Sequence, residues 1–93
     1  GASFMPTIIL IGDSDTGHDN HGPTKVITDS STVKVDGKAV ARLGDTLAPH
    51  GEHSRTIISG SNSVFIDGKP AARAGDTISC GGVLIGNASV KVG

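Results

Sequence analysis

Residues 63–78 read SVFIDGKPAARAGDTI, and residues 32–47 read TVKVDGKAVARLGDTL. Nine of these 16 paired positions are identical at a constant offset of 31 residues. Self-similarity at a fixed period is typical of a repeat architecture. The chain is therefore expected to contain at least two copies of one structural unit.

A third copy is divided between the two ends of the chain. Its second half is LIGD at residues 10–13, which matches RLGD at residues 42–45, and its first half is SVKVG at residues 89–93. The Gly-Asp pairs of the three copies begin at residues 12, 44 and 75. A unit divided in this way predicts a closed ring with the termini side by side, and three units predict pseudo-threefold symmetry.

Each unit has the pattern of a short β-hairpin. Residues 33–35 alternate between apolar and polar, as in a half-buried strand. Asp36-Gly37 then supplies the residues that a tight turn with positive φ requires, and residues 39–43 return as the second strand. The second unit repeats this pattern with residues 64–66, 67–68 and 70–74.

No segment of useful length has the period of a helix, so the fold is expected to be all-β. Pro70, which has no N–H, is expected at a sheet edge or at the start of a strand. The prediction is a small pseudo-threefold cone of three β-hairpin repeats that the two termini close.

The chain has 93 residues, which suggests one domain over residues 5–93, with residues 1–4 as an expression scar ahead of a native Met5. It has two Phe, no Trp, no Tyr and a single Cys, so its core is thin and an internal disulfide is excluded. Such a small domain usually needs a metal or a partner. A net charge of −1 and the lack of stacking aromatics argue against nucleic acid as a partner.

The candidate metal ligands follow the repeat. His18 and His50 each lie five residues after the Asp of a Gly-Asp pair, and Cys80 lies four residues after the third. A ring would carry these three positions to one axis. Imidazole and thiolate are the ligands of tetrahedral zinc, and iron is a second option.

Two histidines compete for the fourth place in this site. His53 and His21 each lie eight residues after the Asp of a Gly-Asp pair. We favour His53, because Pro49-His50-Gly51-Glu52-His53 allows two ligands to leave one tight loop, and His21 is the alternate. The sequence thus predicts one structural metal ion, and no catalytic residue.

The remaining charged residues of the repeat are expected to have structural roles. The Gly-Asp aspartates should bond their own backbone in a turn. The basic residues should pair with the neighbouring Asp of the same repeat on a solvated surface. These basic residues are Lys38, Lys69, Arg42 and Arg73.

Pro70-Ala71-Ala72-Arg73 resembles the signature of the PAAR-repeat family, and the resemblance covers nearly all of residues 5–93. The supporting matches are Gly17-His18, Ala48-Pro49-His50-Gly51 and Ser79-Cys80-Gly81-Gly82. The first full repeat departs from the signature, because it reads Ala39-Val40-Ala41-Arg42.

The resemblance implies a sharp β cone with a metal near its apex, held by three His and one Cys. It implies that the flat base caps a trimeric β-helical spike of a type VI secretion system or a contractile phage tail, with one monomer per trimer. Such a tip is made in the cytoplasm, delivered outward and brought into transient contact with a target membrane.

Two other functions compete with the structural tip. The chain could be an adaptor that links effector proteins to the spike, a role compatible with the first. It could also be a small metallohydrolase, which would need three protein ligands, an open position for water and a cleft. Short side chains in so small a domain offer little cleft, so a non-enzymatic role is favoured.

Overall fold

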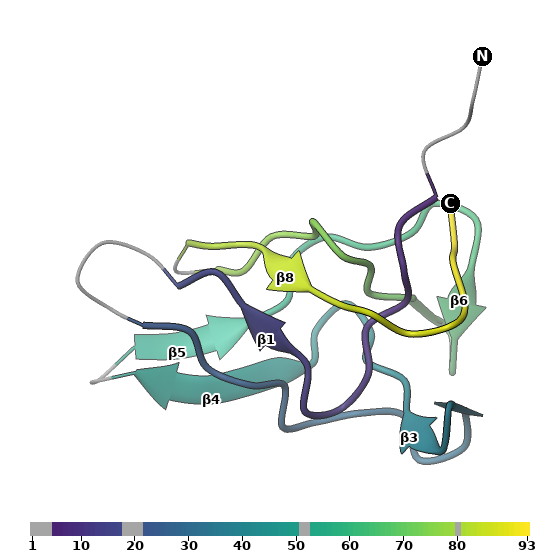
Figure 1. The fold of residues 1–93 in the computed structure, drawn as a ribbon, viewed down its shortest axis with the longest axis horizontal. Helices are drawn as coiled ribbons and strands as arrows, with labels where there is room; N and C mark the ends of the chain where they lie inside the picture. Colours follow the sequence, from purple (N-terminus) through teal and green to yellow (C-terminus); the bar gives the residue numbers. More distant parts are fainter. Residues whose placement is uncertain (1–4, 18–21, 51–52, 80) are drawn as a thin grey trace.

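The computed structural model describes residues 5–17, 22–50, 53–79 and 81–93. Within these ranges the fold is all-β, which confirms the expected class, and it consists of eight short strands in four two-stranded antiparallel sheets (Figure 1). The pairs are β1 (Ser14–Asp15) with β8 (Leu84–Ile85), β2 (Lys34–Val35) with β3 (Lys38–Ala39), β4 (Thr46–His50) with β5 (His53–Thr56), and β6 (Phe65–Ile66) with β7 (Lys69–Pro70). No helix that could cross a membrane occurs among the described residues.

The two Asp-Gly turns form as expected. Val35 pairs with Lys38 in the hairpin β2–β3, so Asp36 and Gly37 are the only loop residues, with φ angles of 54° and 78°. The hairpin β6–β7 has the same loop, where Asp67 and Gly68 have φ angles of 53° and 80°. Positive φ at both central residues matches the right-handed twist of the flanking strands.

A ring of backbone hydrogen bonds joins the three units at the centre of the molecule. The amide of Ile9 donates to the carbonyl of Ala72 at 3.0 Å, Ala72 donates to Ala41 at 3.1 Å, and Ala41 donates back to Ile9 at 2.9 Å. None of these three residues is exposed to solvent. Each unit therefore satisfies the buried backbone of the next, as buried amides require.

The expected closure of the ring by the chain ends is confirmed. Val92 donates its amide to the carbonyl of Pro6 at 2.9 Å, and Thr7 pairs with Lys91 in an antiparallel bridge. The divided third unit is thus assembled from both ends of the chain. A rotation axis that relates the three units stays a prediction.

The ring strands separate two apolar clusters, because their successive side chains point to opposite faces. Ile9, Ala41 and Ala72 face the first cluster, whereas Ile8, Val40 and Ala71 face the second. The predicted return strand at residues 39–43 is therefore shorter than expected. The strand β3 ends at Ala39, although the amide of Val40 still donates to the carbonyl of Val33 at 3.0 Å, and Val40 also bridges to Leu10 in the ring.

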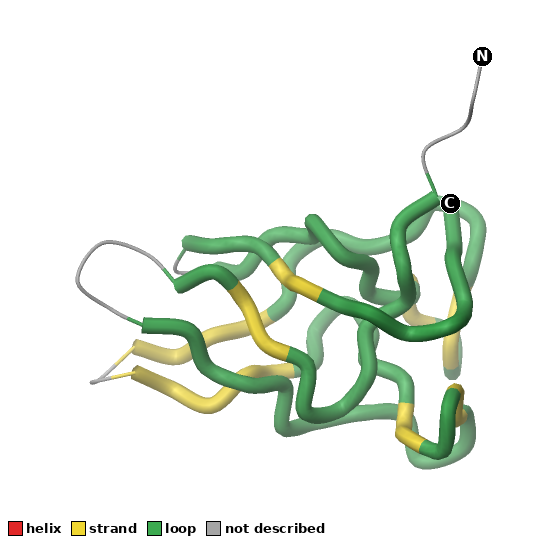
Figure 2. Tube along the Cα trace, in the orientation of Figure 1, coloured by secondary structure: helices red, strands yellow, loops and turns green. Residues whose placement is uncertain are grey.

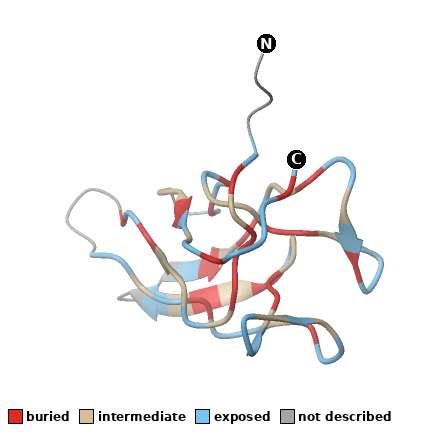
Figure 3. Ribbon diagram, turned by 45° about the vertical axis from the view of Figure 1, so that its right-hand side comes forward, coloured by how far each residue is buried: buried red, intermediate tan, exposed pale blue. Residues whose placement is uncertain are grey.

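The two clusters define two ends of the molecule. We call the base the end that holds hairpins β2–β3 and β6–β7 and the chain ends, and we call the tip the opposite end, where β4 ends and β5 begins (Figures 1 and 2). In this orientation the body narrows from base to tip. Buried residues run through the middle of the body, and the hairpin turns at the base are exposed (Figure 3).

Candidate functional site

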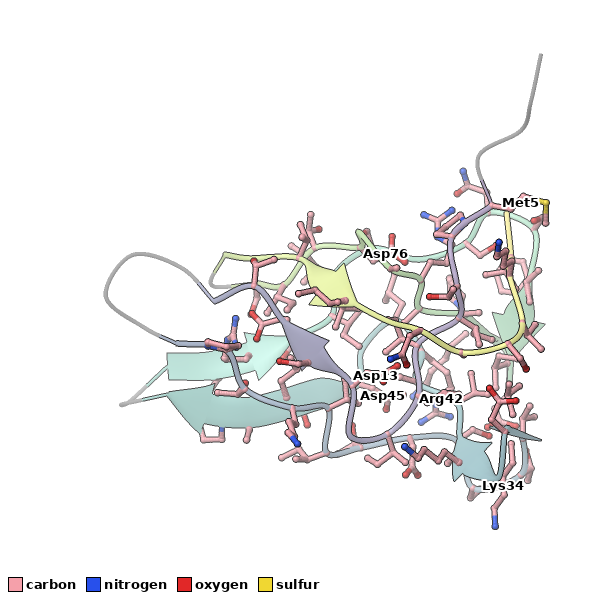
Figure 4. The ribbon with its side chains drawn as sticks, viewed as in Figure 1. Met5, Asp13, Lys34, Arg42, Asp45 and Asp76 are labelled. Carbon is pink, nitrogen blue, oxygen red and sulfur yellow. The ribbon has the colours of Figure 1, made fainter. Side chains whose placement is uncertain are left out.

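The three Gly-Asp corners have the turn role that the repeat predicts. Asp45 accepts the amide of Arg42 at 2.8 Å, and its own amide donates to the carbonyl of Arg42 at 2.9 Å. The same pair of bonds joins Asp13 to Leu10 and Asp76 to Arg73. The aspartates therefore fix the backbone at the corners, around the middle of the molecule (Figure 4).

The expected pairing of the arginines within their repeat is also confirmed, but it does not occur on a solvated surface, because Asp45 and Asp76 are both buried. Arg42 makes a two-pronged contact with Asp45, in which Nε and Nη2 lie 2.8 and 3.0 Å from the carboxylate oxygens. Arg73 makes the same contact with Asp76 at 3.1 and 2.9 Å. The corresponding prediction for the lysines is not confirmed: among the described residues Lys38 and Lys69 make no ion pair, and the pKa of Asp36 is lowered mainly by hydrogen bonds from Ser89 and least by the charge of Lys38.

A buried ion pair lies on the tip side of the core. The side chains of Arg55, in β5, and Asp15, in β1, are both wholly buried. Nη1 of Arg55 lies 2.9 Å from Oδ1 of Asp15 and 2.8 Å from the hydroxyl of Thr24, and Nη2 contacts the other carboxylate oxygen. Nη2 also donates to the carbonyl of Gly81 at 3.2 Å.

The carboxylate of Asp15 is held by backbone donors as well. The amides of Gly17 and Thr24 both donate to it at 2.9 Å. Burial raises the pKa of Asp15, but the hydrogen bonds from Arg55, Thr24 and Gly17 outweigh burial and hold its pKa below the ordinary value. The pair therefore stays charged inside the protein.

The repeat explains why these groups meet. Thr24, Arg55 and Gly82 each stand two residues before a buried apolar residue of the first cluster, so the three units bring them together. Gly82 has a φ of +88°, and a Cβ at this residue would lie 2.8 Å from Oδ2 of Asp15. Only glycine therefore fits beside the carboxylate.

This network ties together the segments that adjoin the predicted metal ligands. Gly17, which precedes His18, donates its amide to the carboxylate of Asp15. Gly81, which follows Cys80, accepts a hydrogen bond from Arg55. In Figure 1 the described ends of all three segments lie at the tip.

The predicted ligands themselves are only partly within the described chain. His18, His21 and Cys80 lie outside the described residues. The backbones of His50 and His53 are strand partners in the hairpin β4–β5. Among the described residues no cluster of metal-ligating side chains occurs, so the metal site stays a prediction.

Sequence reasoning missed Asp15 and Arg55. The repeat carried the signal, because Asp15 occupies the position of Leu47 and Ile78, which are 1% and 2% exposed. A carboxylate at a position that its sister units fill with buried apolar residues requires a buried partner. Arg55 lies two residues before the buried Ile57 and so shares the inward face of its strand.

The base is the second candidate surface. Its apolar cluster contains Ile66 and Val92, and partly buried valines extend this cluster toward solvent. Met5, Phe65 and Val90 are exposed by 49%, 57% and 41%. Met5 and Lys34 lie at this end in Figure 4. The base is thus an apolar surface that also carries lysine side chains.

No curated protein matches the chain. The family model for the PAAR motif matches residues 16–86, most of its 93 residues. The match includes the Pro70-Ala71-Ala72-Arg73 segment, the hairpins β2–β3 and β6–β7 and the buried Arg55. The chain therefore belongs to the PAAR motif family.

Proposed function

We propose that this protein is a structural, non-enzymatic tip that caps the blunt end of a trimeric β-helical spike. Membership of the PAAR motif family carries the proposal, because it associates the chain with the spikes of type VI secretion systems and contractile phage tails. Such a tip is made in the cytoplasm, carried outward on the spike and brought against a target membrane.

The base is the surface that we assign to the spike. A cap has to transmit axial force without shearing away, and a broad apolar contact suits this need. The base offers exposed Phe65, Val90 and Met5 over an apolar cluster. It also holds both chain ends, which leaves the tip free to point forward (Figure 1).

At the tip we propose one structural metal ion, zinc or iron. The chain's own residues for this ion are His18, His50, His53 and Cys80, with His21 as the alternate. A closed set of four such ligands is typical of structural zinc. Two observations support the fit: one hairpin carries His50 and His53, and Arg55 fixes the segments beside the other two ligands. When bound, the ion would tie three loops together and stabilise a thin core.

A binding experiment with matched variants tests the base. The chain is mixed with candidate trimeric spike proteins, and complexes are separated by size. Phe65→Ser should weaken the complex at least tenfold, because it removes an aromatic contact from the interface. Ile58→Ser is the control, since Ile58 is exposed by 54%, close to the 57% of Phe65, but lies outside the hairpins β2–β3 and β6–β7 and the chain ends that define the base. Equal weakening by both variants would contradict the assignment of the base.

A further inference from the structure

Two hairpin turns hold their aspartate against a neighbouring unit. Asp67 accepts hydrogen bonds from the hydroxyls of Ser30 and Thr32, and Nη1 of Arg42 lies 3.1 Å from its carboxylate. Asp36 accepts the amide of Ser89 at 2.8 Å and the hydroxyl of the same residue. At each of these corners a carboxylate of one unit is bound by polar groups of the unit beside it.

The third corner has the donors but no aspartate. Its donors stand at the positions of Ser30, Thr32 and Arg42, one repeat later, and are Ser61, Ser63 and Arg73. Residue 93 occupies the same repeat position in the divided unit as Asp67 occupies in the second full unit. Residue 93 is a glycine.

The donors of this third corner are arranged like those of the corner that holds Asp67, which we call the filled corner. The Oγ of Ser61 accepts the amides of Ser63 and Val64 at 3.1 and 2.9 Å, as the Oγ of Ser30 accepts the two corresponding amides. It donates to the main-chain oxygen of Gly93 at 2.7 Å. An oxygen of residue 93 thus lies where a carboxylate oxygen of Asp67 lies in the filled corner.

One further donor of the corner is left over, because the hydroxyl of Ser63 is already 3.4 Å from that of Ser61. Among the described residues Nη1 of Arg73 meets no acceptor, and the Arg73 side chain is 23% exposed against 13% for Arg42. A Cβ at Gly93 would meet only the Oγ of Ser63, at 3.8 Å. The space that a carboxylate would fill beside Ser63 is therefore open.

We propose that Ser61, Ser63 and Arg73 form a carboxylate-binding site at the third corner of the base. The planar guanidinium and two hydroxyls suit a carboxylate, whose two oxygens accept several hydrogen bonds at once. In a chain that ends at Gly93 one source is the α-carboxylate of this residue, and the other source is an acidic side chain of a molecule bound at the base. The inference does not depend on what that molecule is.

Completing the corner in the chain itself tests the site. Gly93→Asp should have a melting temperature about 2–5 °C higher than that of Gly93→Asn. This is the difference expected when a domain of this size gains one partly exposed hydrogen bond between charged groups. The gain should vanish in the Arg73→Gln background. Equal melting temperatures for Gly93→Asp and Gly93→Asn would overturn the proposal, as would a gain that persists without Arg73.

A second measurement separates the two sources of carboxylate. The chain is prepared with a carboxy-terminal amide and titrated with sodium acetate, with sodium chloride as the control, while the NMR signal of the Arg73 Nε–H is followed. If the α-carboxylate fills the site, amidation itself shifts this signal. If the site serves an external acid, the signal moves with acetate and not with chloride. No response to either change, in the amidated or the free chain, refutes the site.

Discussion

Arg55 and Asp15 form an ion pair in which both side chains are wholly buried, and Nη1 of Arg55 lies 2.9 Å from Oδ1 of Asp15. The pair joins strands β5 and β1, which belong to different units of the ring. Removing both charges from such a pair costs far less than removing one, because a single removal leaves an unpaired charge in the interior.

The first prediction concerns this pair. Asp15→Leu and Arg55→Met should each lower the free energy of unfolding by about 3–5 kcal/mol. The double variant should lose much less than the sum, since Leu47 already fills the position equivalent to Asp15 with an apolar side chain. Urea unfolding of the four proteins gives the coupling free energy directly. Losses that simply add would show that the two residues act independently.

The second prediction concerns acid. Burial raises the pKa of Asp45, but hydrogen bonds from Arg42 and Thr28 outweigh it and hold the pKa below the ordinary value. A carboxyl with a lowered folded pKa stabilises the fold above its unfolded pKa, and this contribution is lost as the pH falls through the folded value. The stability gap between the parent and Asp45→Asn should thus be constant from pH 7 to about pH 5 and shrink below about pH 4. A gap that does not change down to pH 2 would rule out this role for the charge.

Much of the fold could be predicted from the sequence because the repeat copies local chemistry. Asp36-Gly37 and Asp67-Gly68 specify a turn with positive φ wherever they occur between short strands. The division of the third unit between the ends predicted the contact of Pro6 with Val92. These features depend on residues close in the chain or on the order of the repeats.

The buried pair at the tip could not be predicted in the same way. The repeat marks the position of Asp15 as buried and so indicates that a partner is needed, but Arg55 lies 40 residues away at a different position of the repeat, so the repeat does not identify it as that partner. The strands were also shorter than expected, because Val40 makes the last hydrogen bond to its hairpin partner Val33 and already bridges to Leu10 of another unit. Periodicity shows which face of a strand is buried, but not which strand lies opposite it.

The third prediction compares two glycines with similar backbone angles. Gly82→Ala should destabilise the protein more than Gly44→Ala, whose φ is +93° against +88° for Gly82. Both variants carry the strain of a Cβ at positive φ, about 1 kcal/mol. Only at Gly82 would the Cβ press on the carboxylate of Asp15, 2.8 Å away, whereas Gly44 has nothing within 4 Å. Thermal unfolding of both variants measures the difference. If both variants lose the same stability, the segment around residue 82 can move away from Asp15 without a further loss of stability.

The fourth prediction concerns the metal. The purified protein should hold about one zinc or iron ion per chain, as the proposed ligand set requires. Cys80→Ser, His50→Ala and His53→Ala should each lose the ion and lower the melting temperature, whereas His21→Ala should lose little. Elemental analysis after purification without chelator measures the content. If His21→Ala loses the metal ion and His53→Ala keeps it, His21 is the fourth ligand instead of His53. If the parent protein holds no metal, the proposal of a metal site is wrong.

The last prediction concerns stoichiometry. The ring of hydrogen bonds through Ile9, Ala41 and Ala72 already satisfies the backbone groups that a second copy of the chain would have to reach. One chain thus has three related units, and the proposed function would pair each of them with one subunit of a spike trimer. We expect one monomer per spike trimer, and a monomer when the chain is alone. Native mass spectrometry of the complex and light scattering of the free protein determine both values. Three copies on each trimer, or a stable homotrimer of the free chain, would show that the internal repeat has no part in capping.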